Sequence, residues 1–457
     1  MAGVGFELRQ AIHGDNHLSA IRGYLYAAVI SAGPWLLSVV TLSLLGLIAT
    51  SFLSQHATVL FAATITHTFA ISLITTGLVQ MVVTRYLADQ LYLDKTALIA
   101  PTFVSVVVLS AGAQFVLINV LLISTGLPLS YRLSAATLYV AVSEIWIAMI
   151  FLSAARDYVS IALSFAVGYL VSFVAAIGLG SAFGAHAYLM GFAAGQVLTL
   201  GLLAARVLTE FETTEAFNFE FVGYFRRYPA LIGIGFFYSL ALWVDKIAFW
   251  LSPQGQDVGT YLKVFTPYDT SFFVASLVSF VPALVLFTVH LETDFYESYK
   301  RFYAAILDKR SLGNLLEAKE GMARSIRTSY LALLKVQSGL VLLVVTLLTP
   351  IIMQVFDVPQ EHWDTFRVVV VSMSVQVFLL FTTLILQYLD LRGSVLIVSS
   401  VFLATNLGFA VLTILLGHQF YGYGFLASSI ISMVTSFILL TERFKKLEYL
   451  TFMRQPL

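Results

Sequence analysis

Hydrophobic residues fall in long runs that recur along the whole chain, separated by short polar segments. Twelve runs reach the length of about 20 mostly apolar residues that an α-helix needs to cross a bilayer. They lie near 24–50, 57–83, 98–123, 133–153, 158–181, 185–206, 228–251, 270–290, 330–353, 366–388, 395–416 and 420–440. This pattern predicts an all-α, polytopic membrane protein of about twelve transmembrane helices.

Composition supports this fold class. Hydrophobic residues make up 59% of the chain and charged residues 11%, whereas soluble domains carry about 25% charged residues. The net charge is zero, so nothing indicates a nucleic acid partner. The absence of cysteine excludes disulfides and thiolate metal sites. Charged residues precede the first apolar run, so we expect no cleavable signal peptide.

The distribution of Lys and Arg predicts the topology. With the N-terminus inside, the cytoplasmic segments hold 20 of the 25 Lys and Arg residues, and the outer segments hold only Arg132, Lys263 and Arg367. Positive charge concentrates in cytoplasmic loops of membrane proteins. We therefore expect a multi-pass protein of the bacterial inner membrane with both termini in the cytoplasm.

The spans divide into two halves of six. We expect an N-terminal bundle over 1–206, a charged cytoplasmic linker over 207–227 and a C-terminal bundle over 228–457, with a cytoplasmic loop at 291–329. Internal repeats are common in transporters, whose substrate sites lie between the halves. Apolar residues at helical spacing predict one or two interfacial helices within 291–329, and another at Phe6–Ile21; solvated connectors are the alternative.

Catalytic motifs are missing from this sequence. It contains no phosphate-binding loop and no His/Glu spacing typical of zinc sites. The longest extramembrane stretch is too short for a nucleotide-sugar-binding domain. These features argue against an enzyme, and we expect neither a cofactor nor a metal.

Ionisable residues inside spans are costly and often face a cavity or a partner. Glu144 lies midway between Arg132 and Arg156, near the expected membrane midplane, with Trp146 beside it. We expect it to line the substrate pathway; a hydrogen bond between helices is the alternative. His67 is a second candidate, although a lone histidine is often a packing residue.

Two further features of the spans are candidates for transport. Asp245 and Lys246 are adjacent near the outer end of a span, where they need not pair, and Lys246 could extend toward water. Gly33 and Pro34 interrupt the first span and could form a hinge or a static kink.

Several stretches resemble the PelG family of inner-membrane Pel exopolysaccharide exporters over the whole chain. These are Met1-Ala-Gly-Val-Gly-Phe-Glu-Leu-Arg9, Arg22-Gly-Tyr24, Ser31-Ala-Gly-Pro-Trp-Leu-Leu-Ser38, Trp243-Val-Asp-Lys246 and His290-Leu-Glu-Thr-Asp-Phe-Tyr-Glu-Ser-Tyr-Lys300. The resemblance implies membership of the flippase superfamily that includes multidrug antiporters and lipid-linked oligosaccharide flippases. It implies two six-helix bundles around a central cavity.

The resemblance also implies a substrate and partners. The substrate would be a nascent polymer rich in N-acetylgalactosamine. The partners would be a cytoplasmic Pel glycosyltransferase and the membrane proteins PelD and PelE, with PelD sensing cyclic di-GMP. Apart from the resemblance, 291–329 holds seven Lys and Arg residues, Arg324 and Arg327 among them, interspersed with acids. This mixed face would suit docking of a protein partner; anionic lipid headgroups are the alternative.

Two other functions remain open from the sequence. One is an ion-coupled antiporter for lipid-linked oligosaccharides or drugs, and the other is a non-transporting scaffold for a polysaccharide synthase. Buried acids favour transport over a scaffold. The spans hold only Lys246 and Lys335 as cations, so we expect a neutral or weakly basic polymer rather than an anionic one.

The topology can be tested directly. Reporter fusions at Gly313 and at Leu457 are both expected to report a cytoplasmic location, because the charge bias places both on the inner side. Alkaline phosphatase activity at either position would show that a span has been miscounted.

Overall fold

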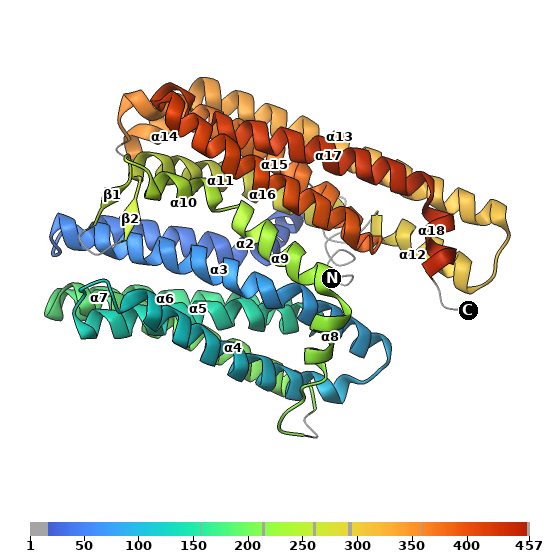
Figure 1. Ribbon diagram of the computed structural model, residues 1–457, viewed down its shortest axis with the longest axis horizontal. Helices are drawn as coiled ribbons and strands as arrows, with labels where there is room; N and C mark the ends of the chain where they lie inside the picture. Colours follow the sequence, from blue (N-terminus) through green and yellow to red (C-terminus); the bar gives the residue numbers. More distant parts are fainter. Residues whose placement is uncertain are drawn as a thin grey trace.

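The computed structural model describes residues 17–155, 157–212, 215–258, 262–290, 295–356 and 358–454 and is almost entirely helical (Figure 1). The first half contains α2 (His17–Ala49), α3 (Gln55–Tyr92), α4 (Ile99–Leu122), α5 (Leu129–Ala155), α6 (Tyr158–Phe183), α7 (Ala185–Glu210) and α8 (Phe221–Arg227). The second half contains α9 (Pro229–Ala241), α10 (Val244–Leu251), α11 (Thr266–His290), α12 (Tyr296–Leu307), α13 (Leu312–Leu343), α14 (Thr349–Val355), α15 (Trp363–Tyr388), α16 (Arg392–Leu416), α17 (Tyr423–Lys445) and α18 (Leu447–Arg454). A short antiparallel pair, β1 (Gln256–Asp257) and β2 (Lys263–Val264), separates α10 from α11.

The predicted fold class is confirmed. Within the described ranges, ten helices are long and apolar enough to cross a membrane, and the pair α9 and α10, bent by 50°, would make an eleventh. The remaining predicted span corresponds to α2, whose described apolar part is Gly33–Ala49. Gly184, with φ +83°, separates α6 from α7, and Gly417, with φ +98°, separates α16 from the short helix η5 (His418–Phe420) that precedes α17. Each predicted span therefore matches one helix or one helix pair.

Extramembrane elements gather at the two ends of the molecule. Figure 1 shows α8, α12 and α18 at one end and the β1–β2 pair at the opposite end. This arrangement is the one that the predicted topology requires, because it puts the linker, the 291–329 segment and the C-terminal helix together. The assignment of that end to the cytoplasm stays a prediction. Most of Phe6–Ile21 lies outside the described residues, and its last part belongs to α2.

Two hydrophobic clusters make up the core. One extends from Leu45 to Phe221 and the other from Leu231 to Leu447. We call α2–α7 the N-terminal lobe and α9–α17 the C-terminal lobe. Val258, which follows β1, and Val264 of β2 belong to the first cluster, whereas Ala70 and Val82 of α3 belong to the second. Each lobe therefore packs some of its residues into the core of the other, along α3 and at the β1–β2 pair.

The linker between the lobes is anchored to the N-terminal lobe by Asn218, which is 7% exposed. The Asn218 side-chain amide donates to the Tyr86 hydroxyl at 2.7 Å and to the Thr102 hydroxyl at 3.0 Å. Its backbone N–H donates to Ser105 at 2.9 Å. A buried amide satisfied in this way fixes the position at which the chain turns into α8.

The described part of the 291–329 segment forms α12 and the first half of α13, and α13 does not end where the predicted span begins. Ser311 caps the N-terminus of α13, and that helix continues without a break to Leu343, inside the predicted span. No proline interrupts this stretch, so the same helix runs from solvent into the apolar region. Lys319 of α13 bonds Glu448 of α18 at 2.7 Å and holds the C-terminal helix against α13.

The backbones of the two lobes approach each other closely where α3 crosses α9. A Cβ atom added at Gly77 would lie 2.7 Å from the Gly235 carbonyl oxygen, and one added at Gly235 would lie 2.0 Å from the Gly77 carbonyl oxygen. Small residues permit such contact between transmembrane helices. Because the obstructing atoms belong to the backbone, a side chain at either position would push the lobes apart.

Alanine at either position is therefore expected to destabilise the protein. We expect Gly77→Ala and Gly235→Ala each to lower the free energy of unfolding by about 1–3 kcal/mol, the usual cost of overpacking. Thermal unfolding of the purified protein measures this change. Gly112→Ala and Gly408→Ala are matched controls, since a Cβ there meets no atom within 4 Å. Equal stability of the Gly77→Ala and Gly112→Ala variants would contradict the close crossing.

Candidate functional site

The seventh predicted span is broken between Ala241 and Val244, where α9 ends and α10 begins. The last carbonyls of a helix have no partner within the helix. Here the Ala241 carbonyl accepts a hydrogen bond from the Asn406 side-chain amide at 2.8 Å. The Leu242 carbonyl accepts one from the Lys246 ammonium at 3.1 Å. Side chains therefore compensate the break inside the membrane, where water is not available.

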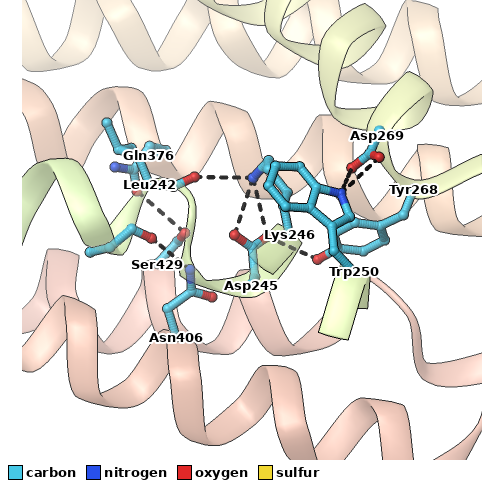
Figure 2. Close-up of polar contacts among 10 residues, drawn as sticks. Leu242, Asp245, Lys246, Trp250, Tyr268, Asp269, Gln376, Asn406 and Ser429 are labelled. Carbon is cyan, nitrogen blue, oxygen red and sulfur yellow. Dashed lines mark hydrogen bonds and ion pairs between the residues drawn. The ribbon is translucent and has the colours of Figure 1, made fainter. Parts of the chain in front are cut away.

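Lys246 and Asp245 form a buried ion pair at this break (Figure 2). The ammonium nitrogen lies 3.1 Å and 3.2 Å from the two Asp245 carboxylate oxygens. Asp245 is 0% exposed and Lys246 is 8% exposed. The expectations that these neighbours need not pair and that Lys246 could extend to water are therefore wrong.

The local backbone explains this pairing. The break lets the lysine side chain turn back toward the carbonyl end of α9, which is the negative end of the helix dipole, while Asp245 lies in the first turn of α10, at the positive end. The ammonium also lies over aromatic rings, 3.6 Å from the Phe272 centroid and 5.2 Å from the Phe425 centroid. Such contacts favour a desolvated cation.

Polar contacts continue from this pair into α11 (Figure 2). The Tyr268 hydroxyl donates to Asp245 at 3.0 Å. The Trp250 indole N–H donates to the two Asp269 carboxylate oxygens at 2.9 Å and 3.1 Å. These three residues were not predicted from the sequence, because the eighth apolar run begins near 270 and nothing in the sequence indicates that positions 19 apart meet.

His67 contributes a contact between the lobes. Its ring stacks on the Trp250 ring with centroids 4.3 Å apart and planes inclined by 28°. Its Nδ1 atom lies 2.9 Å from the Ala63 carbonyl oxygen. His67 therefore belongs to α3 of the N-terminal lobe but touches α10 of the C-terminal lobe, beside the Asp269 contact.

A cavity of about 180 Å³ lies between α3, α4 and α5, next to His67. Its polar lining includes Thr64, Tyr131 and Tyr139, and its apolar lining includes Leu262 from the C-terminal lobe. At the Tyr139 side of the cavity, the Tyr139 hydroxyl donates to the Gln114 side-chain oxygen at 2.6 Å, and the Thr75 hydroxyl donates to the same oxygen at 3.1 Å. Hydroxyl and amide groups thus extend along the interior of the N-terminal lobe.

Glu144 lies farther along α5 and is 1% exposed. Neither carboxylate oxygen has a hydrogen-bond partner among the described residues, although Ser110 of α4 is close enough to interact with it. Because Ser110 belongs to α4, the pathway role of Glu144 and the alternative of a hydrogen bond between helices both stay predictions. Trp146 follows on the same helix, and its indole N–H donates to Ser72 of α3 at 3.2 Å.

The candidate residues form two groups rather than one. Glu144, Trp146 and His67 lie in the N-terminal lobe, whereas Asp245 and Lys246 lie in the C-terminal lobe, and the His67–Trp250 stack connects the lobes. None of these positions is shown to line a pathway, so their role in transport stays a prediction. Among the residues that the structure describes, no cluster of three or more His, Asp or Glu side chains could hold a metal ion.

The other candidate residues lie apart from these groups. Gly33 and Pro34 lie within the continuous helix α2, where the Ser38 hydroxyl donates to the Pro34 carbonyl at 2.8 Å. A hinge at this position stays a prediction. Arg324 and Arg327 are exposed on the part of α13 that precedes the membrane, and docking of a partner there also stays a prediction.

Solved structures with a similar fold are transporters. The chain is similar to a MOP superfamily transporter from Pyrococcus furiosus, with a TM-score of 0.66, 14% identity and coverage of 98% of this chain and 99% of that one. A multidrug resistance MATE family transporter of the MOP superfamily in an outward-facing conformation gives a TM-score of 0.67 at 14% identity, covering 98% and 99%. The Vibrio cholerae MATE transporter VcmN gives 0.64 at 12% identity, covering 98% and 99%. At such identities, the similarity establishes the fold alone.

Comparison of the sequence with protein families identifies its relatives. No curated protein matches the chain. The family model PelG, described as "Putative exopolysaccharide Exporter (EPS-E)", matches residues 1–452. Since this match covers nearly the whole sequence, the chain belongs to the PelG family of exopolysaccharide exporters, with the fold of MOP superfamily transporters.

Proposed function

We propose that the chain exports a nascent Pel-type exopolysaccharide, rich in N-acetylgalactosamine, across the bacterial inner membrane. The match of the PelG family model to residues 1–452 carries this proposal. The two-lobed helical fold supports it, since a substrate path between lobes is typical of transporters built from repeated halves. A cytoplasmic glycosyltransferase supplies the growing chain, and PelD and PelE complete the assembly.

Charge inside the protein favours a neutral or weakly basic polymer. Lys246 is the sole buried Lys or Arg in the described part of the chain, and Asp245 neutralises it. Glu144 and Asp269 add acidic groups without a buried cation of their own. A uronate polymer or a lipid pyrophosphate would need cations along its path, because a buried anion without a partner is very unfavourable.

Glu144 is the residue whose environment most favours a role on the pathway. A buried carboxyl group without hydrogen-bond partners costs free energy that packing alone does not recover. Such a group persists when a substrate or a proton interacts with it during transport. The neighbouring polar groups of Tyr139 and Gln114 extend this environment toward the cavity.

Removal of this carboxyl is therefore expected to block export. Glu144→Ala should abolish secreted polymer, whereas polymer is retained in the cells and the protein level on immunoblots is unchanged. Glu144→Gln keeps the hydrogen-bonding groups without the charge and so separates the two contributions. Glu361→Ala is the matched control, because Glu361 is an exposed acid on the connection before α15. Full export by both Glu144 variants would leave this residue with a packing role only.

Docking of the glycosyltransferase on α13 is the second part of the proposal. Arg324 and Arg327 are exposed, whereas the nearby Lys319 is engaged with Glu448. Charge reversal at both arginines should therefore weaken co-purification of the glycosyltransferase, and Lys95→Glu, on the connection before α4, is a control. Unchanged co-purification with reduced membrane insertion would assign the two arginines to topology alone.

A further inference from the structure

The Lys246 ammonium occupies a position with the features of a site for a small monovalent cation. Three oxygen atoms surround it: the two of the Asp245 carboxylate at 3.1 Å and 3.2 Å, and the Leu242 carbonyl at 3.1 Å. The ring centroids of Phe272 and Phe425 lie 3.6 Å and 5.2 Å away. A carboxylate, a free main-chain carbonyl and aromatic faces are all groups that attract cations.

The backbone around this position matches that of ion sites in other membrane transporters. Broken transmembrane helices expose carbonyl groups at the C-terminal ends of half-helices, and such carbonyls coordinate sodium in transporters. Here α9 ends at Ala241, and the Leu242 carbonyl that follows points to the ammonium. The position therefore combines a helix break, a buried carboxylate and a cation.

Asn406 gives an independent indication that the break can hold a ligand. The side chain is 0% exposed, and its amide N–H donates to the Ala241 carbonyl. Its carbonyl oxygen has no hydrogen-bond partner among the described residues. Figure 2 shows Asn406 and Asp245 at the same break. An additional oxygen acceptor is thus carried by a side chain that bonds the carbonyl group directly before Leu242.

We infer that the Lys246 ammonium is a tethered cation that fills a monovalent cation site in the C-terminal lobe. With the ammonium in place, Asp245 is neutralised in every step of transport, and no sodium ion or potassium ion enters there. What this implies for the energy source of transport rests on the proposed function, because an exporter driven by polymer synthesis needs no coupling ion at this site. An ion-coupled antiporter would need the site to empty and refill.

Removal of the tether tests this inference on the purified full-length protein. Thermal unfolding is measured in sodium, potassium and choline chloride at equal ionic strength. The wild-type midpoint is expected to be the same in the three salts. Lys246→Ala leaves the buried Asp245 carboxylate with the Tyr268 hydroxyl but without a cation, and it lowers the midpoint in choline. Sodium or potassium should restore it in a saturable manner, because a bound ligand stabilises the folded state.

Two variants serve as controls for the cation response. Lys335→Ala removes an exposed lysine of α13 and is expected to behave as the wild type in every salt. The double variant Asp245→Asn with Lys246→Ala lacks the carboxylate and is expected to lose the response to sodium and potassium. Lys246→Ser, which leaves similar space, is the second variant if Lys246→Ala does not fold in choline.

The outcomes separate the inference from the proposed function. Equal unfolding midpoints of Lys246→Ala in the three salts would overturn the inference. Failure of both Lys246→Ala and Lys246→Ser to fold in any of the three salts would also overturn it. Folding that is recovered only in sodium or potassium supports it. The assay contains no polymer, so its result does not depend on whether the chain exports polysaccharide.

Discussion

The structure depends on one constraint: inside the membrane, a backbone carbonyl freed by a break in a helix needs a partner within the protein. The break between α9 and α10 concentrates this requirement, since it frees carbonyl groups where water is absent. Asn406 and Lys246 satisfy the Ala241 and Leu242 carbonyls. The Lys246 ammonium is neutralised by the Asp245 carboxylate, which also accepts a hydrogen bond from the Tyr268 hydroxyl. The bend of this span and its buried Asp245–Lys246 ion pair are therefore one feature.

The same region connects the two lobes. Trp250 donates to Asp269 in the C-terminal lobe and stacks on His67 of the N-terminal lobe. Farther along α3, the backbones of Gly77 and Gly235 are in contact. One contact is aromatic, and the other consists of backbone atoms alone.

Much of the fold could be predicted from hydropathy and charge. The apolar runs gave all twelve segments, because a helix in lipid must be apolar over a fixed length. The break at Leu242 was not predicted, since neither glycine nor proline marks it. The continuation of α13 from Leu312 was also missed, because hydropathy records where lipid begins and not where a helix begins.

The site was predictable only in part. Glu144, Asp245 and Lys246 stand out because charges are rare in spans, and all three are buried. Their partners could not be read from the sequence: Tyr268 reaches Asp245 from another helix, and Asp269 pairs with a tryptophan 19 positions away. Lys246 turns inward because of the helix break. The resemblance to the PelG family came from local stretches, and the family match over residues 1–452 confirms it.

Reconstitution measures the central claim most directly. Vesicles containing the chain and its glycosyltransferase, with the catalytic side outward, receive labelled nucleotide sugar in the external medium. The account predicts labelled polymer inside the vesicles, protected from an added hydrolase, and none inside when the chain is omitted. Collapse of ion gradients should leave the amount unchanged. Polymer that remains wholly accessible outside the vesicles with both proteins present would contradict export by this chain.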